Sequence, residues 1–167
     1  MAAHQDRDFM RHAIKVMRDA GVVNKSGGPF GAVIVKHGKV IAAAGNSVIR
    51  DNDPSAHAEV NAIRQACRAI KNWDLSGCVM YSSCECCPMC YSAAHWANIR
   101  SIFYAASWSD SKASFLTEQL MTTSVVLYLK KRFECSRSFR AKRRRCGPSS
   151  VVCLTVLATD PPSSCHL

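Results

Sequence analysis

The chain has 167 residues, 48% of them hydrophobic, and a formal net charge of +10. Its length suffices for one domain with a sizeable core, because a domain of about 150 residues buries roughly 70% of its unfolded surface. The first twenty residues carry charges every few positions and no apolar signal region. This argues against a secretory signal or a membrane anchor and predicts a cytoplasmic protein.

The distribution of basic charge and the spacing of the cysteines restrict the partners and the chemistry that we expect of the chain. Residues 1–115 carry 13 Lys and Arg against 9 Asp and Glu, whereas residues 116–167 carry 9 against 3. The basic excess therefore belongs mainly to the C-terminal part, so binding of nucleic acid is not the favoured interpretation. Four of the ten cysteines fall within residues 84–90, which without an extracellular address favours metal or redox chemistry over disulfides.

The first half of the chain predicts a helix, a hairpin and a second helix. Apolar residues at helical spacing predict an amphipathic helix over 5–20, with Gly21 as its stop. The apolar runs 30–35 and 40–45 predict two strands joined by a tight hairpin. Both runs are apolar at successive positions, so we expect both strands to be covered on both faces. After a loop, helical spacing predicts a helix that begins close to His57.

The following segments predict a strand, a helix and a strand. We expect a buried strand over 78–83, a helix over 87–99 that tolerates Pro88 in its first turn, and a strand over 102–107. The complete order is helix, hairpin, helix, strand, helix, strand. It predicts an α/β fold in which a mixed central sheet carries helices on its faces, as a three-layer α/β/α domain.

Beyond Phe115 the pattern changes to an atypical basic C-terminal tail. It becomes polar, basic and rich in Pro, Ser and Cys, and we assign no fold to residues 134–167. We therefore divide the chain into a domain at 1–115 and a divergent, partly disordered tail at 116–167. The KRRR run at 142–145 is interpreted as part of a solvated tail, although it could be a nuclear signal or a phosphate-binding patch.

Two short motifs carry the chemistry. An H-A-E sequence at 57–59 precedes a C-P-M-C sequence at 87–90, with one predicted helix and one predicted strand between them. One imidazole and two thiolates suit tetrahedral Zn²⁺ and leave a fourth position for water, as in a catalytic zinc site. If both motifs begin adjacent helices, the helix dipoles favour thiolate over thiol. We predict His57, Cys87 and Cys90 as ligands of Zn²⁺.

Glu59, the third residue of the H-A-E motif, supplies the second part of the prediction, a group that moves protons. Zinc can lower the pKa of a bound water to about 7, but expelling ammonia also requires protons at a ring nitrogen and at the leaving amine. Glu59, two residues from a predicted ligand, is placed to move them. An H-x-E motif followed by C-x-x-C is the signature of zinc deaminases, so we expect hydrolytic deamination of a nucleobase-type substrate.

Several stretches resemble the cytidine and deoxycytidylate deaminase superfamily, and more narrowly its bacterial-type guanine deaminase branch. They are GGPFGAVIVK at 27–36, NDPSAHAEVNAIR at 52–64, SSCECCPMC at 82–90 and IFYAA at 102–106. The resemblance covers roughly residues 8–115. It implies a cytidine-deaminase-like fold, His57, Cys87 and Cys90 as zinc ligands, and Glu59 as the proton shuttle.

The resemblance also implies a substrate and a pocket. It implies that Asn46 hydrogen-bonds the purine ring, with Phe30 and the backbone of Ala58 shaping the pocket. The implied reaction is guanine plus water giving xanthine plus ammonia, catalysed by a hydrolase of C–N bonds in cyclic amidines, and a homodimer is implied as well. From the residues alone, Asn46 could instead cap the turn after the second strand, and Phe30 could be a core residue, as could Trp96.

The chain departs from the family pattern at two places. Cys86 stands where the family usually has proline before the first Cys ligand, which loosens the backbone and adds a competing thiol. Cys84 has its own C-x-x-C spacing to Cys87 and could become a fourth ligand that closes the site. After Phe115 the family's acidic pair and closing segment are not matched, and Glu118 could replace the expected acid.

Two other functions remain open at this point. The chemistry could act on a base in RNA, as in tRNA adenosine deaminases, which share the H-A-E and P-C-x-x-C elements, and the basic tail favours this alternative. A protein of a different class would use zinc only to hold its fold and would have no working pocket. The small-molecule purine is the favoured substrate, because the sequence context of both motifs resembles the guanine branch.

Overall fold

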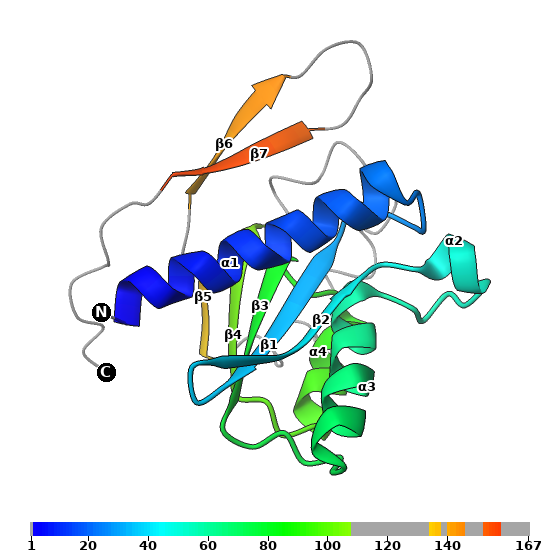
Figure 1. Ribbon diagram of the computed structural model, residues 1–167, viewed down its shortest axis with the longest axis vertical. Helices are drawn as coiled ribbons and strands as arrows, with labels where there is room; N and C mark the ends of the chain where they lie inside the picture. The colour runs from blue at the N-terminus through cyan, green and yellow to red at the C-terminus, as the bar shows by residue number, and fades with distance from the viewer. Residues whose placement is uncertain (1, 108–133, 138–139, 146–151, 158–167) are drawn as a thin grey trace.

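Helices lie on both faces of a mixed β-sheet in the computed structural model, which describes residues 2–107, 134–137, 140–145 and 152–157 (Figure 1). In chain order the elements are α1 (Ala2–Arg18), the π-helical turn η1 (Asp19–Val23), β1 (Gly31–Lys36), β2 (Lys39–Gly45), α2 (Val48–Asp51), α3 (Ala58–Ile70), β3 (Cys78–Cys84), α4 (Pro88–Trp96), β4 (Ser101–Ala106), β5 (Glu134–Arg137), β6 (Arg140–Arg145) and β7 (Val152–Leu157).

The sheet has the strand order β2-β1-β3-β4-β5. β1 is antiparallel to both β2 and β3, whereas β3, β4 and β5 run parallel. Helix α1 packs on one face, and α3 with α4 covers the other (Figure 1). The predicted three-layer α/β/α domain with a mixed sheet is therefore confirmed.

Each face of the sheet has its own hydrophobic core. The core under α3 and α4 contains Ile34, Met80, Tyr91 and Ile102, and the core under α1 contains Met10, Val33 and Tyr81, all among the buried residues. The alternation of Val33 and Ile34 between the two cores follows from the period of two along a strand. Helix α1 approaches β1 so closely that a side chain at Gly31 would overlap the backbone of Ala13 and Met17.

The hairpin between β1 and β2 forms where it was predicted. His37 and Gly38 both have positive φ, of 49° and 72°, as in the two-residue turns that match the twist of a hairpin. The expectation that both strands are covered on both faces holds for β1 but is wrong for β2. β2 is the edge strand: Ala42 and Ala44 are buried under α3, whereas Ala43 on the opposite face is only partly covered.

Two predicted helix features are wrong. The first helix does not stop at Gly21, because η1 continues to Val23 and Asn24 N–H bonds to the carbonyl of Asp19. Gly21 instead allows close packing, since a Cβ there would overlap Pro29. The fourth helix ends at Trp96 rather than at 99, and Trp96 is 80% exposed, so it is not a core residue.

The C-terminal part contains secondary structure to which the sequence led us to assign no fold. β5 extends the sheet beside β4, and β6 with β7 forms an antiparallel pair. The apolar, β-branched run of β7 accounts for that pairing, and the basic run at 142–145 lies in β6. The domain boundary at 115/116 and Glu118 lie outside the described residues, so partial disorder of the tail stays a prediction. Among the described residues, no helix is long and apolar enough to cross a membrane.

Candidate metal centre and active site

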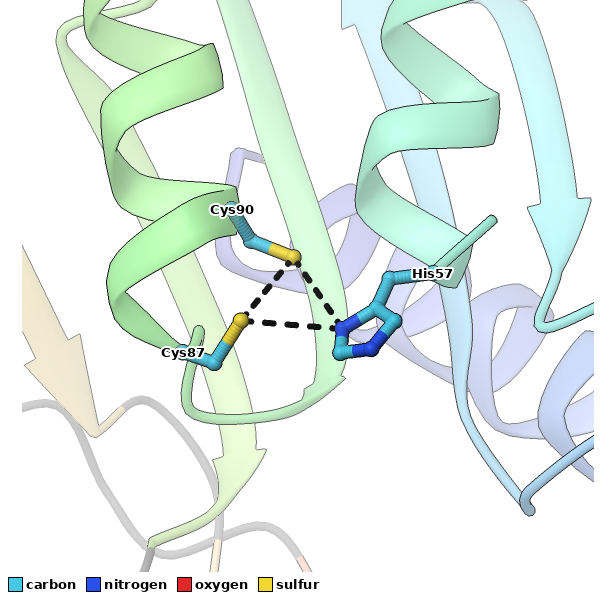
Figure 2. A group of neighbouring side chains, drawn as sticks. All are labelled: His57, Cys87 and Cys90. Atoms are coloured by element: carbon cyan, nitrogen blue, oxygen red, sulfur yellow. Dashed lines mark hydrogen bonds between the residues drawn. The ribbon is translucent and has the colours of Figure 1, made fainter. Parts of the chain in front are cut away.

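Three side chains from the two motifs converge where α3 and α4 begin (Figure 2). Nδ1 of His57 lies 3.6 Å from Sγ of Cys87 and 3.6 Å from Sγ of Cys90, and the two sulfur atoms are 3.5 Å apart. Within the part of the chain that the structure describes, this is a group of His and Cys side chains that could hold a metal ion. We call it the ligand triangle.

The ends of two helices create the ligand triangle. His57 is the N-cap of α3 and Cys87 is the N-cap of α4, and both have extended backbone that turns the chain into the helix. Pro88 occupies the first turn of α4, where its missing N–H leaves no gap in the helical hydrogen bonds. Cys90 follows one turn into α4 and is buried against α3. The positive ends of both helix dipoles therefore face the sulfur atoms, which favours thiolates.

The size of the ligand triangle fits zinc. Zn²⁺ bonds to sulfur at about 2.3 Å and to nitrogen at about 2.0–2.1 Å, so tetrahedral ligands stand about 3.5–3.6 Å apart for sulfur to nitrogen and about 3.8 Å for sulfur to sulfur. The observed edges of 3.6, 3.6 and 3.5 Å differ from these values by a few tenths of an ångström at most. The donor set of one imidazole and two thiols is also one that zinc prefers.

The electrostatics of the ligand triangle favour a negative charge on sulfur. Hydrogen bonds from Cys90 and from His57 lower the pKa of the Cys87 thiol to about 4. The same bond to Cys87, together with burial, raises the pKa of Cys90, and the neighbouring Cys87 raises the pKa of His57. One thiolate is thus stabilised before any metal is added.

Glu59 lies beside the ligand triangle with its carboxyl group in a fixed position. Its Oε1 accepts a hydrogen bond of 2.9 Å from the hydroxyl of Ser82, and its Oε2 lies 3.4 Å from Sγ of Cys90. Only 5% of Glu59 is exposed, and this burial raises the pKa of its carboxyl group. A buried carboxyl group whose pKa is raised in this way binds a proton more readily than an exposed one, as a group that moves protons requires.

The three predicted substrate-binding residues lie next to the ends of three elements. Phe30 precedes β1, Asn46 follows β2, and Ala58 begins α3. Asn46 is buried, and its Oδ1 accepts a hydrogen bond of 3.1 Å from Val48 N–H, so it does cap the turn after β2. Within the described residues, its amide nitrogen has no hydrogen-bond partner and no bond joins it to the ligand triangle. Phe30 is partly buried against the core under α3, and its carbonyl accepts a bond from Asn46 N–H. Ala58 is fully buried as the first residue of α3.

Residues 3–106 match the family model of the cytidine and deoxycytidylate deaminase zinc-binding region. The chain belongs to this deaminase family. The match includes α1, the hairpin and both motifs, and it ends at residue 106, the last residue of β4. The resemblance inferred from the sequence is therefore confirmed.

Curated relatives of this deaminase domain include enzymes with different substrates. Guanine deaminase of Bacillus subtilis (strain 168) is 48% identical over 103 residues, which are 62% of this chain and 65% of the relative. A tRNA-specific adenosine deaminase of Agrobacterium fabrum is 42% identical over 98 residues, which are 59% of this chain and 63% of the relative. The chain thus spans less than two thirds of the length of either relative.

The fold of the deaminase domain is also that of a solved relative. The crystal structure of the Bacillus subtilis guanine deaminase superimposes with a TM-score of 0.63 at 46% sequence identity. The superposition covers 65% of this chain and 69% of that chain.

The extra cysteines of the deaminase domain stay out of the ligand triangle. Cys86, which replaces the expected proline, has no exposed surface and belongs to the core under α3 and α4. Cys84 is also buried, at the end of β3. Among the described residues, the group able to hold a metal includes neither of them. The alternative in which Cys84 closes the site as a fourth ligand is therefore not supported.

Sequence reasoning missed two polar residues that organise the site. Ser82 holds Glu59, and Asn61 donates hydrogen bonds to the end of β2 and to the loop before His57. A signal existed for each, because Ser82 is one of two adjacent serines in a buried strand and Asn61 is a poor helix former inside a helix. A cavity of about 410 Å³ beside β2 and α3 is lined by Ser47, Asn61 and Arg68 among others, and its lining includes none of the predicted site residues.

Proposed function

We propose that this deaminase domain catalyses the hydrolytic deamination of a purine base, with guanine as the substrate. The observation that carries the proposal is the buried carboxyl group of Glu59, which lies 3.4 Å from Cys90 and beside a ligand triangle that fits zinc. The 48% identity to a guanine deaminase supports guanine as the base. Water and guanine give xanthine and ammonia, so the carbonyl oxygen comes from water and the C–N bond breaks.

In this proposal His57, Cys87 and Cys90 hold Zn²⁺. When bound, zinc would lower the pKa of a water molecule towards neutrality and so make a nucleophile available. The helix N-termini at His57 and Cys87 help to keep the sulfur ligands ionised. Because Cys90 is buried, solvent that would compete for the metal is kept away from its side of the ligand triangle.

Glu59 moves the protons of the reaction. Its Oε2, on the side of the ligand triangle, takes a proton from the attacking water. It delivers this proton to the ring nitrogen. It then takes the second proton from the hydroxyl group of the tetrahedral adduct and delivers it to the amine, which leaves as ammonia as the C–N bond breaks. Ser82 keeps Oε1 engaged, so the same oxygen Oε2 faces the reacting atoms throughout. The raised pKa of the buried carboxyl group favours its uptake of a proton from water.

Asn46, Phe30 and Ala58 bind the base in this proposal. The amide nitrogen of Asn46 is available to a purine acceptor, because the bond to Val48 uses only its oxygen. The ring of Phe30 covers the base, and the backbone N–H of Ala58, in the first turn of α3, is not used by the helix. The homodimer and the cytoplasmic location stay predictions.

The second candidate function is deamination of adenosine in tRNA. A tRNA-specific adenosine deaminase that is 42% identical favours it, as does the basic character of residues 116–167. The shared chemistry would use the same Glu59 and the same ligand triangle. The two functions therefore differ in the groups that bind the substrate rather than in those that move protons.

Parallel assays of the zinc-loaded protein test these functions. Guanine conversion to xanthine is followed by ultraviolet absorbance, inosine formation is measured in transfer RNA, and Glu59→Ala controls for contaminating enzymes. We expect turnover of guanine by the wild type alone. Inosine without xanthine would favour the RNA substrate. A folded, zinc-bound protein inactive on both would favour the non-catalytic zinc module.

A further inference from the structure

Asn61 connects three backbone segments through one side-chain amide. From the second turn of α3, its Nδ2 donates to the carbonyl of Gly45 at 3.1 Å, to the hydroxyl of Ser47 at 2.8 Å and to the carbonyl of Ala56 at 3.2 Å. The two N–H groups are shared among these three acceptors. The amide therefore ties the end of β2 to the loop that precedes α3.

Both tied segments carry predicted site residues. Asn46 lies between Gly45 and Ser47, and Ala56 immediately precedes His57. A second link runs parallel to the amide, because Ser47 N–H donates to the same Ala56 carbonyl at 3.0 Å. The position of Asn46 relative to His57 therefore depends on a contact that Asn61 reinforces from outside the site.

The neighbouring bonds permit only one orientation of the Asn61 amide. The Ser47 hydroxyl donates its own proton to Asp51 at 2.6 Å, so towards Asn61 it acts as an acceptor. The carbonyls of Gly45 and Ala56 are acceptors as well. An amide NH₂ group satisfies all three, whereas a carboxylate of the same shape would set oxygen against oxygen at each of them.

We propose that Asn61 is a positioning residue for the deaminase reaction. It holds Asn46 at the correct distance from His57 and thereby sets the affinity for the purine base. This inference rests on the proposed function. Asn is a poor helix former, so its presence inside α3 is not explained by the helix itself. The side-chain hydrogen bonds of Asn61 reach neither the ligand triangle nor Glu59, although its backbone N–H donates to the carbonyl of His57 at 2.9 Å.

The test compares Asn61→Asp and Asn61→Ala with Gln65→Ala. Gln65 lies one turn later in α3, is exposed, and makes no hydrogen bond within the described residues, so it controls for a change on the same helix. We expect KM for guanine to rise about tenfold in Asn61→Asp, because the loss of one hydrogen bond weakens binding by about that factor. We expect kcat to change less. Zinc content remains that of the wild type in all three variants.

A double variant identifies the route of the effect. If Asn61 acts through Asn46, the change in KM on adding Asn61→Asp should largely disappear in the Asn46→Ala background. A change in KM that is equally large in both backgrounds would overturn the proposal. So would a KM within twofold of the wild-type value in both Asn61 variants.

Amide hydrogen exchange tests the same inference without any turnover. The Ser47 N–H bond to Ala56 should open more often once Asn61 no longer holds the two segments, so we expect exchange at Ser47 to accelerate about tenfold in Asn61→Asp. The buried amides of β3 serve as the reference and should not change. Unaltered exchange at Ser47 would overturn the positioning role. If the wild type does not convert guanine but Ser47 exchange accelerates, the proposed function fails while the positioning role stands.

Discussion

The hydroxyl of Ser82 donates a hydrogen bond of 2.9 Å to Oε1 of Glu59, and both residues are buried. Ser82 belongs to β3 in the middle of the sheet, whereas Glu59 belongs to α3 on its face. The sheet thus fixes one oxygen of the carboxyl group and leaves the other beside Cys90. The central strand of the sheet therefore sets the orientation of the carboxyl group.

Replacing Ser82 by alanine should weaken both the fold and the reaction. The variant leaves a buried carboxyl oxygen without its partner, and such a loss lowers the free energy of unfolding by about 1–3 kcal/mol. Urea unfolding of the zinc-loaded protein measures it. Ser101→Ala, at a partly exposed position in β4, is the matched control and should change stability by less than about 0.5 kcal/mol. Equal stability of Ser82→Ala and wild type would contradict the observed bond.

Removal of either sulfur ligand should abolish metal binding. In Cys87→Ser and Cys90→Ser the ligand triangle loses a thiolate. We therefore expect the zinc content, measured by elemental mass spectrometry, to fall from one ion per chain to nearly none. Cys67→Ser changes a thiol on α3 outside the ligand triangle and should retain the metal. Full zinc content in both ligand variants would show that the ion is bound elsewhere.

Zinc should also stabilise the folded state. A ligand that binds only the native protein raises the free energy of unfolding by about 2.7 kcal/mol when its free concentration is 100 times its dissociation constant. Thermal unfolding with added zinc and with a chelator measures the difference. We expect a higher midpoint with zinc in the wild type and no response in Cys90→Ser. A response of equal size in both proteins would contradict the assignment of this ligand.

The network next to Asn61 predicts a pH dependence of stability. Hydrogen bonds from Arg50 and Ser47 lower the pKa of Asp51 to about 2, from an ordinary value of 3.8. The ionised form therefore stabilises the fold above about pH 4, and this contribution is lost as the pH falls from about 4 to about 2. The difference in free energy of unfolding between wild type and Asp51→Asn should shrink over that interval. A difference that grows towards low pH would contradict the sign, and 1 M salt should reduce it, because Asp51 is at the surface.

Gly31→Ala should disrupt the packing of α1 on the sheet. The added methyl group would overlap the backbone of Ala13 and Met17, which cannot move aside as the end of a flexible side chain can. Overpacking of this kind lowers stability by about 1–3 kcal/mol, and occasionally more. Gly38→Asn is the control, because its turn is open and Asn tolerates positive φ. Thermal unfolding of both variants checks the prediction, and equal midpoints would contradict it.

The sequence predicted the order of elements and the ligand triangle because both are local patterns. Periodicity placed the helices and strands, and the motif spacing put His57 and Cys87 at two helix starts. What it could not give were properties set by neighbours in space. The exposure of β2 follows from its place at the sheet edge. Position 21 is occupied by glycine because a Cβ there would overlap Pro29, which follows in the next loop. Trp96, the last residue of α4, is 80% exposed, which its apolar character did not indicate.

The site shows the same division between local and spatial information. Glu59 was identified from its spacing to His57, but the partner that holds it comes from β3, 23 positions along the chain. For Asn46 the two interpretations are compatible, because the amide oxygen caps the turn while the amide nitrogen has no hydrogen-bond partner in the part of the chain that the structure describes. The segments around Asn46 and His57 are brought together by Asn61, and only the fold reveals that contact.

The central claim is that the buried carboxyl group beside the ligand triangle moves the protons of a guanine deamination. The most direct test measures ammonia release from guanine by zinc-loaded wild type and by Glu59→Gln, which keeps the shape and the bond to Ser82 but cannot carry a proton. We predict steady release by the wild type and a rate at least 100-fold lower in Glu59→Gln, about the smallest contribution of a general acid–base group, with zinc content and unfolding midpoint unchanged. Comparable rates from the two folded, zinc-bound proteins would contradict the claim.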